Sequence, residues 1–274
     1  MKKLRILIPT DFSVLARKAA VYAHQLSQNL DAEYVLLHCD DKLRPTYALV
    51  SHLDDEIRKE AIKTMHELAI SIQDETGLHA PIKVDFLVGD PISSLEKYSK
   101  DHHIDMVVMG TKGESVIKNK LFGSVASGVM ENVSCPILFV PAVSEIEVPR
   151  NIAFATDLTN LDEEIMELIA FAQFFTATIH VIHVYPDMIE PDTFDEETTQ
   201  LALIASTHYP NITFNAVMDS DIIGGINRFI ESDKPNMLAM FTYKTGILEY
   251  LFNESISEEL VGHSTKPLLV LRKG

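Results

Sequence analysis

The sequence predicts an α/β protein of two tandem, doubly wound domains, each a five-stranded parallel sheet with helices on both faces. Three observations predict this fold class. Short apolar runs alternate with segments of helical periodicity. The runs are continuously apolar, as in strands of parallel sheets that are buried on both faces. The whole pattern restarts after residue 150. Alternating strands and helices favour a parallel sheet, and right-handed crossovers place helices on both of its faces. At 274 residues the chain is long enough for two domains with separate cores.

The first half of the chain alternates strands and helices. Alanines at helical spacing from Ala16 to Ala23 mark a first helix, and an apolar stripe from Leu53 to Ile72 marks a long second helix that ends at Gly77. Gly89-Asp90-Pro91 forms a turn before the third helix. We predict strands at residues 5–9, 34–38, 82–88, 106–109 and 137–140, and helices at about 16–30, 48–75, 92–101 and 125–133.

The second half repeats this order. Ile152 to Asp157 parallels Ile6 to Asp11, and a helix at about 160–175 follows it. Three further apolar runs and Pro267 match the first half, so the repeat is about 130 to 145 residues long. A polar linker at 142–150 separates the copies, and we predict domains at 1–142 and 149–274. The strands expected in the second domain after Ile152 are residues 178–185, 212–218, 237–240 and 268–271.

Composition and charge exclude several classes of protein. A net charge of −17 argues against nucleic acid or an anionic membrane as a partner. No apolar run approaches the ~18 residues of a transmembrane helix. The apolar run from Leu4 ends at Asp11 without a cleavage site, so we expect a first strand rather than a signal peptide, and a cytoplasmic protein. Cys39 and Cys135 lack metal or redox spacing, and we expect two free thiols.

A glycine loop after the fourth strand is the most informative motif. Gly110, Gly113 and Gly123-Ser124 separate that strand from the helix that follows. Glycine lets the backbone take positive φ and approach a ligand closely, and a helix N-terminus with free N–H groups suits phosphate. The chain contains neither the Walker pattern nor G-x-G-x-x-G after a strand. Asp11, after the first strand, would lie at the same carboxyl edge of the sheet.

The glycine loop has the spacing G-x2-G-x9-G-S, which resembles the ATP-binding signature of the universal stress protein family. The segments Cys135 to Val140 after the loop and Ile6 to Ser13 at the start of the chain resemble the same family. The resemblance implies an adenine nucleotide alpha hydrolase-like fold and ATP as the ligand, with Mg as a candidate companion ion. In the family the first loop lies along the adenine and ribose, the backbone after the second strand meets the adenine, and the glycine loop lines the ribose and triphosphate. The residues in these three places are Pro9, Thr10 and Asp11; Cys39; and Met109, Gly110, Gly113, Gly123, Ser124, Val125 and Ala126.

The second domain lacks this loop. Aligning Pro136 with Pro267 puts Phe241, Lys244 and Glu254 where the three glycines stand, and only Ser255 is kept. A bulky ring and a carboxylate would fill or repel a phosphate pocket. We therefore expect one nucleotide per chain, bound in the first domain, and we expect Asp157 to cap a helix.

The resemblance implies a stress-response regulator or sensor that binds ATP without fast chemistry. No Ser/His/Asp or Cys/His arrangement is visible from spacing, and His38, His102 and His103 fit surface or capping roles. Two alternatives stay open: a slow ATPase or adenylate-forming enzyme of the same fold, and an interaction protein that binds no nucleotide. Because domains of the family commonly dimerise through their last strand, we also expect the two domains to pair within the chain, with a further homodimer possible.

Overall fold

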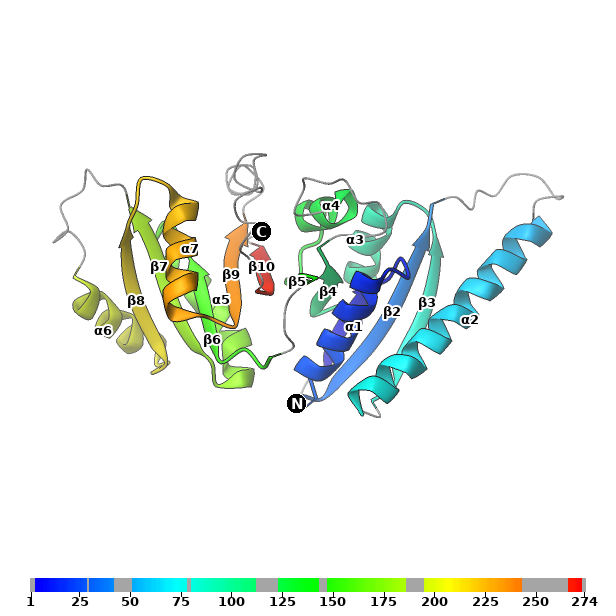
Figure 1. Cartoon of the computed structure of the whole chain (residues 1–274), viewed down its shortest axis with the longest axis horizontal. Coiled ribbons are helices and arrows are strands. Elements are labelled where there is room, and N and C mark those ends of the chain that lie inside the picture. The colour runs from blue at the N-terminus through cyan, green and yellow to red at the C-terminus, as the bar shows by residue number, and fades with distance from the viewer. Residues whose placement is uncertain are drawn as a thin grey trace. The chain divides into compact units, whose positions relative to one another are not determined.

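The computed structural model describes residues 3–28, 30–41, 51–77, 80–111, 123–142, 147–185, 195–242 and 266–272, and the side chains of residues 51–54 are left aside. The chain divides into two compact units, Met1–Ala142 and Val143–Gly274. Both are α/β, with parallel strands and helices on the two faces of each sheet (Figure 1). The predicted fold class is therefore confirmed.

The N-terminal unit contains a five-stranded parallel sheet in the order β3-β2-β1-β4-β5. The helices pack in pairs, α1 with α2 and α3 with α4, on opposite faces of the sheet (Figure 1). The strand order reverses between β1 and β4, and in open α/β sheets ligands bind at such a reversal, outside the carboxyl ends of the strands. The elements are β1 Leu4–Pro9, α1 Val14–Leu26, β2 Ala32–Asp40, α2 Ser51–Thr76, β3 Ile82–Val88, α3 Pro91–Asp101, β4 Met106–Gly110, α4 Ser124–Asn132 and β5 Ile137–Val140.

Most of these elements match the prediction, and the end of α1 does not. α1 stops at Leu26 rather than near residue 30, because Ser27 caps it. The Ser27 hydroxyl bonds the Ala23 carbonyl at 2.6 Å and the Tyr34 hydroxyl at 2.6 Å, which holds the chain out of the helix and against β2. α2 ends as predicted before Gly77, which takes φ +65°.

The C-terminal unit repeats the arrangement, with the parallel order β8-β7-β6-β9-β10. Its first helix ends at Ala172 rather than near 175 and continues as one 3₁₀ turn, after which Thr176 is left-handed. α7 lies in front of this sheet in Figure 1 and α5 behind it. The elements are β6 Asn151–Ala155, α5 Leu161–Ala172, η1 Gln173–Phe175, β7 Thr178–Tyr185, α6 Glu196–Thr207, β8 Ile212–Met218, α7 Ile222–Asp233, β9 Met237–Thr242 and β10 Leu268–Arg272.

The loops after β1 and β6 make the same contacts, which fixes the correspondence between the units. The Thr10 N–H donates to the Leu37 carbonyl, and the Thr156 N–H donates to the Ile182 carbonyl. Thr10 therefore corresponds to Thr156, and each residue of α1 corresponds to the residue of α5 at the same separation. Within the described residues, no helix is long and apolar enough to cross a membrane.

Candidate functional site

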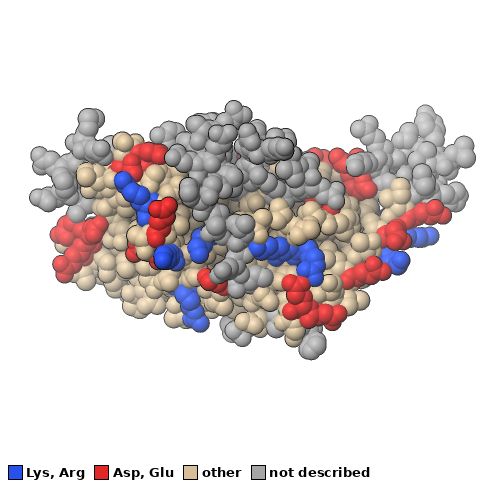
Figure 2. Space-filling view, in the orientation of Figure 1, with Lys and Arg blue, Asp and Glu red and all other residues tan. Residues whose placement is uncertain are grey.

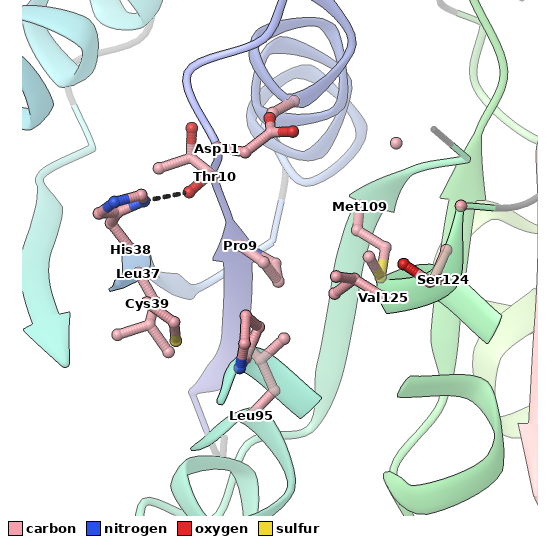
Figure 3. Close-up of a pocket in the computed structure, with 15 residues that line it drawn as sticks. Pro9, Thr10, Asp11, Leu37, His38, Cys39, Leu95, Met109, Ser124 and Val125 are labelled. Carbon is pink, nitrogen blue, oxygen red and sulfur yellow. Dashed lines mark hydrogen bonds between the residues drawn. The ribbon is translucent and has the colours of Figure 1, made fainter. Parts of the chain in front are cut away.

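One pocket at the carboxyl edge of the N-terminal sheet collects the predicted site residues. All of them line it except Gly113, which lies outside the described residues. In Figure 3 the residues of β1 and β2 form one side, and Met109, Ser124 and Val125 form the other. The predicted residues in the lining are Pro9, Thr10, Asp11, Cys39, Met109, Gly110, Gly123, Ser124, Val125 and Ala126. Whether they bind a nucleotide stays a prediction.

The loop that follows β1 is held by its own side chains. Thr10 Oγ1 accepts the N–H of Phe12 at 3.1 Å, and Asp11 Oδ1 accepts the N–H of Ser13 at 3.0 Å. Ser13 then caps α1 by accepting from the Ala16 N–H at 3.2 Å. Phe12 takes φ +65°, which non-glycine residues rarely adopt. The turn therefore fixes where the Asp11 carboxylate lies in the pocket.

His38 ties this loop to the next strand. Its Nδ1 lies 2.7 Å from the Thr10 carbonyl oxygen, which can only accept, so Nδ1 carries the proton and donates it. The ring centroid of His38 lies 4.6 Å from that of Phe12, and Figure 3 shows the hydrogen bond of His38 to Thr10 as a dashed line. A surface or capping role was the prediction for His38, and the structure places it in the pocket wall instead. The sequence offers one indication of this role, because a histidine recurs at the corresponding position of the second unit. That residue, His183, has its Nδ1 3.1 Å from the Thr156 carbonyl oxygen.

Cys39 presents a neutral thiol to the pocket. Burial raises its pKa to about 11, the nearby Asp90 and Asp85 carboxylates add to the shift, and a hydrogen bond with Ser94 opposes it. The thiolate, which is the nucleophilic form, is therefore scarce at neutral pH. Burial likewise raises the pKa of Cys135 to about 12. Both cysteines are free and partly buried.

The opposite side of the pocket is the N-terminus of α4. Gly123 is its N-cap, and no side chain of the described residues makes a cap hydrogen bond there. Ser124 and Val125 form the start of the first turn and are exposed. The first N–H groups of a helix have no partner within the helix and carry its positive dipole end. This end of the pocket therefore favours an anion.

Gly110 and Gly123 do not take the positive φ that glycine permits. Gly123 has φ −70° and Gly110 is not left-handed, so neither needs the special freedom of glycine at φ. Close packing favours glycine at position 110, because a Cβ there would lie 3.2 Å from the backbone of Leu15, which would have to shift by a few tenths of an ångström. The absence of a side chain at Gly110 lets α1 approach the end of β4.

Residues that the prediction did not include complete the apolar wall. They are Ala16, Leu37, Pro91 and Leu95. The cavity has a volume of about 150 Å³, which is comparable with the engineered apolar cavities that bind benzene. It is large enough for one aromatic ring, and the rest of a larger ligand would lie toward the open edge. No group of three or more His, Cys, Asp or Glu side chains suited to a metal occurs among the described residues.

The C-terminal unit replaces one wall of this pocket with a ring. Phe241 pairs with Leu271 in β9 and β10 as Gly110 pairs with Val140 in β4 and β5, so Phe241 stands in the place of Gly110. Its ring is buried and packs edge-on against Phe154 with centroids 5.8 Å apart. Lys244, Glu254 and Ser255 lie outside the described residues.

Comparisons with known proteins agree on one family. The family model for the Universal stress protein family matches residues 4–141. A universal stress protein of Methanocaldococcus jannaschii is 31% identical over 143 residues, covering 50% of this chain and 81% of its own length. One of Bacillus subtilis is 26% identical over 146 residues, covering 50% of this chain and 97% of its own length. The crystal structure of a universal stress protein from Archaeoglobus fulgidus covers 100% of both chains at 21% identity, with a TM-score of 0.77, which supports the fold across both units.

Proposed function

The chain belongs to the universal stress protein family, and we propose from this premise that its N-terminal unit binds ATP and serves as a stress-response regulator or sensor. The observation that carries the proposal is the two-sided pocket. A cavity of aromatic-ring size with apolar walls opens toward the uncapped N-terminus of α4. An adenine nucleotide combines a flat apolar ring with an anion at its other end. The two sides of the pocket complement those two parts of one molecule.

Each part of the nucleotide has a proposed place. Leu37, Cys39 and Leu95 receive the base in the apolar cavity. The loop of Thr10 and Asp11, which stands between the cavity and the open edge, contacts the ribose through its polar atoms. The backbone N–H groups at the start of α4 and the Ser124 hydroxyl bind phosphate oxygens. Mg would be held by the phosphates with water, since that ion usually keeps several waters.

A binding role is favoured over catalysis by the chemistry of the pocket lining. Its one thiol, Cys39, is neutral at physiological pH because burial raises its pKa to about 11. Incubation of the protein with ATP discriminates among the open alternatives. Unchanged ATP supports a sensor, ADP indicates an ATPase, and AMP with pyrophosphate indicates adenylate formation. Absence of any binding would support a pure interaction protein.

The substitution Ser124→Glu tests the proposed phosphate site. A carboxylate in the first turn of α4 stabilises the helix through its dipole but occupies and repels the site of the anion. We expect ATP affinity to fall by roughly 10- to 100-fold, the effect of losing one or two charge-assisted hydrogen bonds. The affinity for adenosine, which has no phosphate, should fall much less.

Ser124→Gln is the matched control, because it removes the hydroxyl without adding charge. Isothermal titration of both variants with ATP and adenosine gives the comparison. Equal losses for ATP and adenosine, or equal affinity of the two variants for ATP, would place the phosphates elsewhere.

Three finer features of the proposal have their own tests. Titration with and without EDTA shows whether Mg contributes to ATP affinity. Pairing of the two units through β5 and β10, and any homodimer, are tested by cross-linking and by analytical ultracentrifugation of the full chain. A cytoplasmic location is tested by cell fractionation.

A further inference from the structure

The outer side of α5 carries exposed apolar side chains in a row. Met166 is 51% exposed and Phe174, in the 3₁₀ turn that extends the helix, is 47% exposed. Ala170 lies between them and is also exposed. Residues four apart lie on one side of a helix, so the three form a single apolar strip. We call Met166, Ala170 and Phe174 the α5 strip.

In the N-terminal unit two of the three corresponding positions are covered, and the third, Gln28, is exposed. Ala20 and His24 of α1 correspond to Met166 and Ala170, and both are fully buried. The cover is α2, which packs along α1. Arg17 of α1 bonds Ser71 Oγ at 3.0 Å and pairs with Glu75 at 2.5 Å, while His24 Nδ1 lies 2.8 Å from Thr76 Oγ1. In one copy of the fold this face is thus a helix-docking surface.

The helix that follows β7 does not repeat this cover. α6 spans 12 residues where α2 spans 26. α6 packs against β8, and no comparable packing joins it to α5 within the described part of the chain. Met166 and Phe174 are accordingly left exposed. Exposed apolar surface of this kind marks sites of interaction, and methionine is common at them because its side chain adapts to its partner.

The charge around the α5 strip is opposite to that around α1. Glu163 stands where Arg17 stands, and Asp162 and Glu167 are exposed beside it. The excess extends to the whole unit: residues 143–274 carry 21 of the 40 acidic residues and 7 of the 23 basic ones. Figure 2 shows part of it on α6, where Asp195, Glu196 and Glu197 begin the helix. An occupant would therefore carry Lys or Arg where α2 carries Glu75.

We propose that the α5 strip and its acidic border dock a basic amphipathic helix of a partner protein, in the place that α2 takes on α1. Apolar side chains of the partner helix cover Met166 and Phe174, and its cations face Asp162, Glu163 and Glu167. This is the helix-on-surface mode of recognition, with contacts repeating every three to four residues. The proposal does not depend on nucleotide binding.

Two labelled synthetic peptides test it with the full chain. Both form a helix with the same stripe of Leu and Ile, and one has Lys and Arg on the flanks where the other has Glu. Fluorescence anisotropy at low salt should show binding of the basic peptide and at least roughly tenfold weaker binding of the acidic one. The double variant Met166→Ser, Phe174→Ser should bind the basic peptide roughly tenfold or more weakly than the wild type does. Glu163→Arg combined with Glu167→Lys should do the same through charge.

Matched controls are exposed apolar residues elsewhere. Leu201 on α6 is 59% exposed and Ile70 on α2 is 58% exposed, so Leu201→Ser and Ile70→Ser should leave the affinity unchanged. All the variants change exposed side chains, and equal thermal midpoints would show that each remains folded. Equal binding of the two peptides, or unchanged binding in the double variant, would overturn the proposal. Self-association of the full chain that the double variant abolishes would overturn it too, because the occupant would then be a second copy.

Discussion

At the scale of single residues, the pocket depends on a histidine from the strand beside its loop. His38 Nδ1 donates to the Thr10 carbonyl at 2.7 Å, and its ring contacts Phe12, the residue with φ +65°. Left-handed backbone at a bulky residue costs about 1–3 kcal/mol and persists only where surrounding contacts hold it. His38 supplies two of those contacts. It therefore acts as a positioning residue for Thr10 and Asp11.

The substitution His38→Ala should lower the affinities for ATP and for adenosine by the same factor, because it loosens the side of the pocket that both ligands share. Loss of one hydrogen bond and one ring contact, at about 1 kcal/mol each, predicts a decrease of roughly 5- to 50-fold. Isothermal titration measures both ligands. His183→Ala removes the same contact from the C-terminal unit and should leave both affinities unchanged. A loss for ATP alone would argue against the positioning role.

The residues foreseen from the sequence are those that stand in spaced patterns. Asp11 directly follows an apolar run, and Gly110, Gly123 and Ser124 stand at fixed spacing between a strand and a helix. The apolar wall had no such mark. Leu37 and Leu95 resemble any other core leucine in the sequence, and only the packing of α3 against the sheet brings them to one cavity.

At the scale of elements, a buried imidazole joins α1 to the end of α2. His24 is fully buried, with Nδ1 beside Thr76 Oγ1 and Nε2 3.3 Å from the Ala80 carbonyl oxygen. Burial lowers its pKa, and the hydrogen bond to Ala80 offsets part of that shift. The Thr76 hydroxyl donates to the Ile72 carbonyl at 2.8 Å, so its oxygen accepts from Nδ1–H in the neutral ring, and the 3.3 Å contact of Nε2 with the Ala80 carbonyl, which also accepts from Gln73 Nε2, is the weaker one. The packed form of α1 and α2 thus contains neutral His24.

The sign of the pH dependence follows from that lowered pKa. The unfolded chain takes up a proton near pH ~6.5, where folded His24 still resists it. Stability is therefore lost as pH falls through and below that value, because the unfolded state binds more protons. The stability advantage of the wild type over His24→Gln should shrink from pH 7.5 to pH 5.5, by thermal unfolding. An advantage that stays constant or grows on acidification would contradict a neutral His24. His180, whose pKa burial also lowers, remains in both proteins and cancels in the comparison.

Strands were easier to foresee than helix ends. β3 Ile82–Val88, β5 Ile137–Val140, β7 Thr178–Tyr185 and β8 Ile212–Met218 all match the predicted ranges. Their boundaries coincide with changes from apolar to polar residues or to Pro and Gly, which the sequence displays. The ends of α1 and α5 depend on contacts with distant residues, such as that of Ser27 with Tyr34, and periodicity does not contain that information.

At the scale of the whole molecule, the two units share a fold and differ at two surfaces. The end of β4 is Gly110 in the first unit, and the same place holds Phe241 in the second. The outer face of the first helix is covered in the first unit and exposed in the second. On this account, one unit binds the nucleotide and the other presents a surface for a partner. The repeat in the sequence predicted the shared fold. The differences between the two units became visible only from the register of the strands and the exposure of the side chains.

The two-sided pocket predicts that the chain binds one adenine nucleotide, in its N-terminal unit. Isothermal titration of the full chain with a non-hydrolysable ATP analogue measures this most directly, because it gives affinity and stoichiometry together. We expect saturable binding with close to one nucleotide per chain, greatly weakened by Ser124→Glu and unaffected by Asp157→Ala. A stoichiometry near two would show that Phe241 does not prevent binding, and the absence of saturable binding by the wild type would contradict the claim itself.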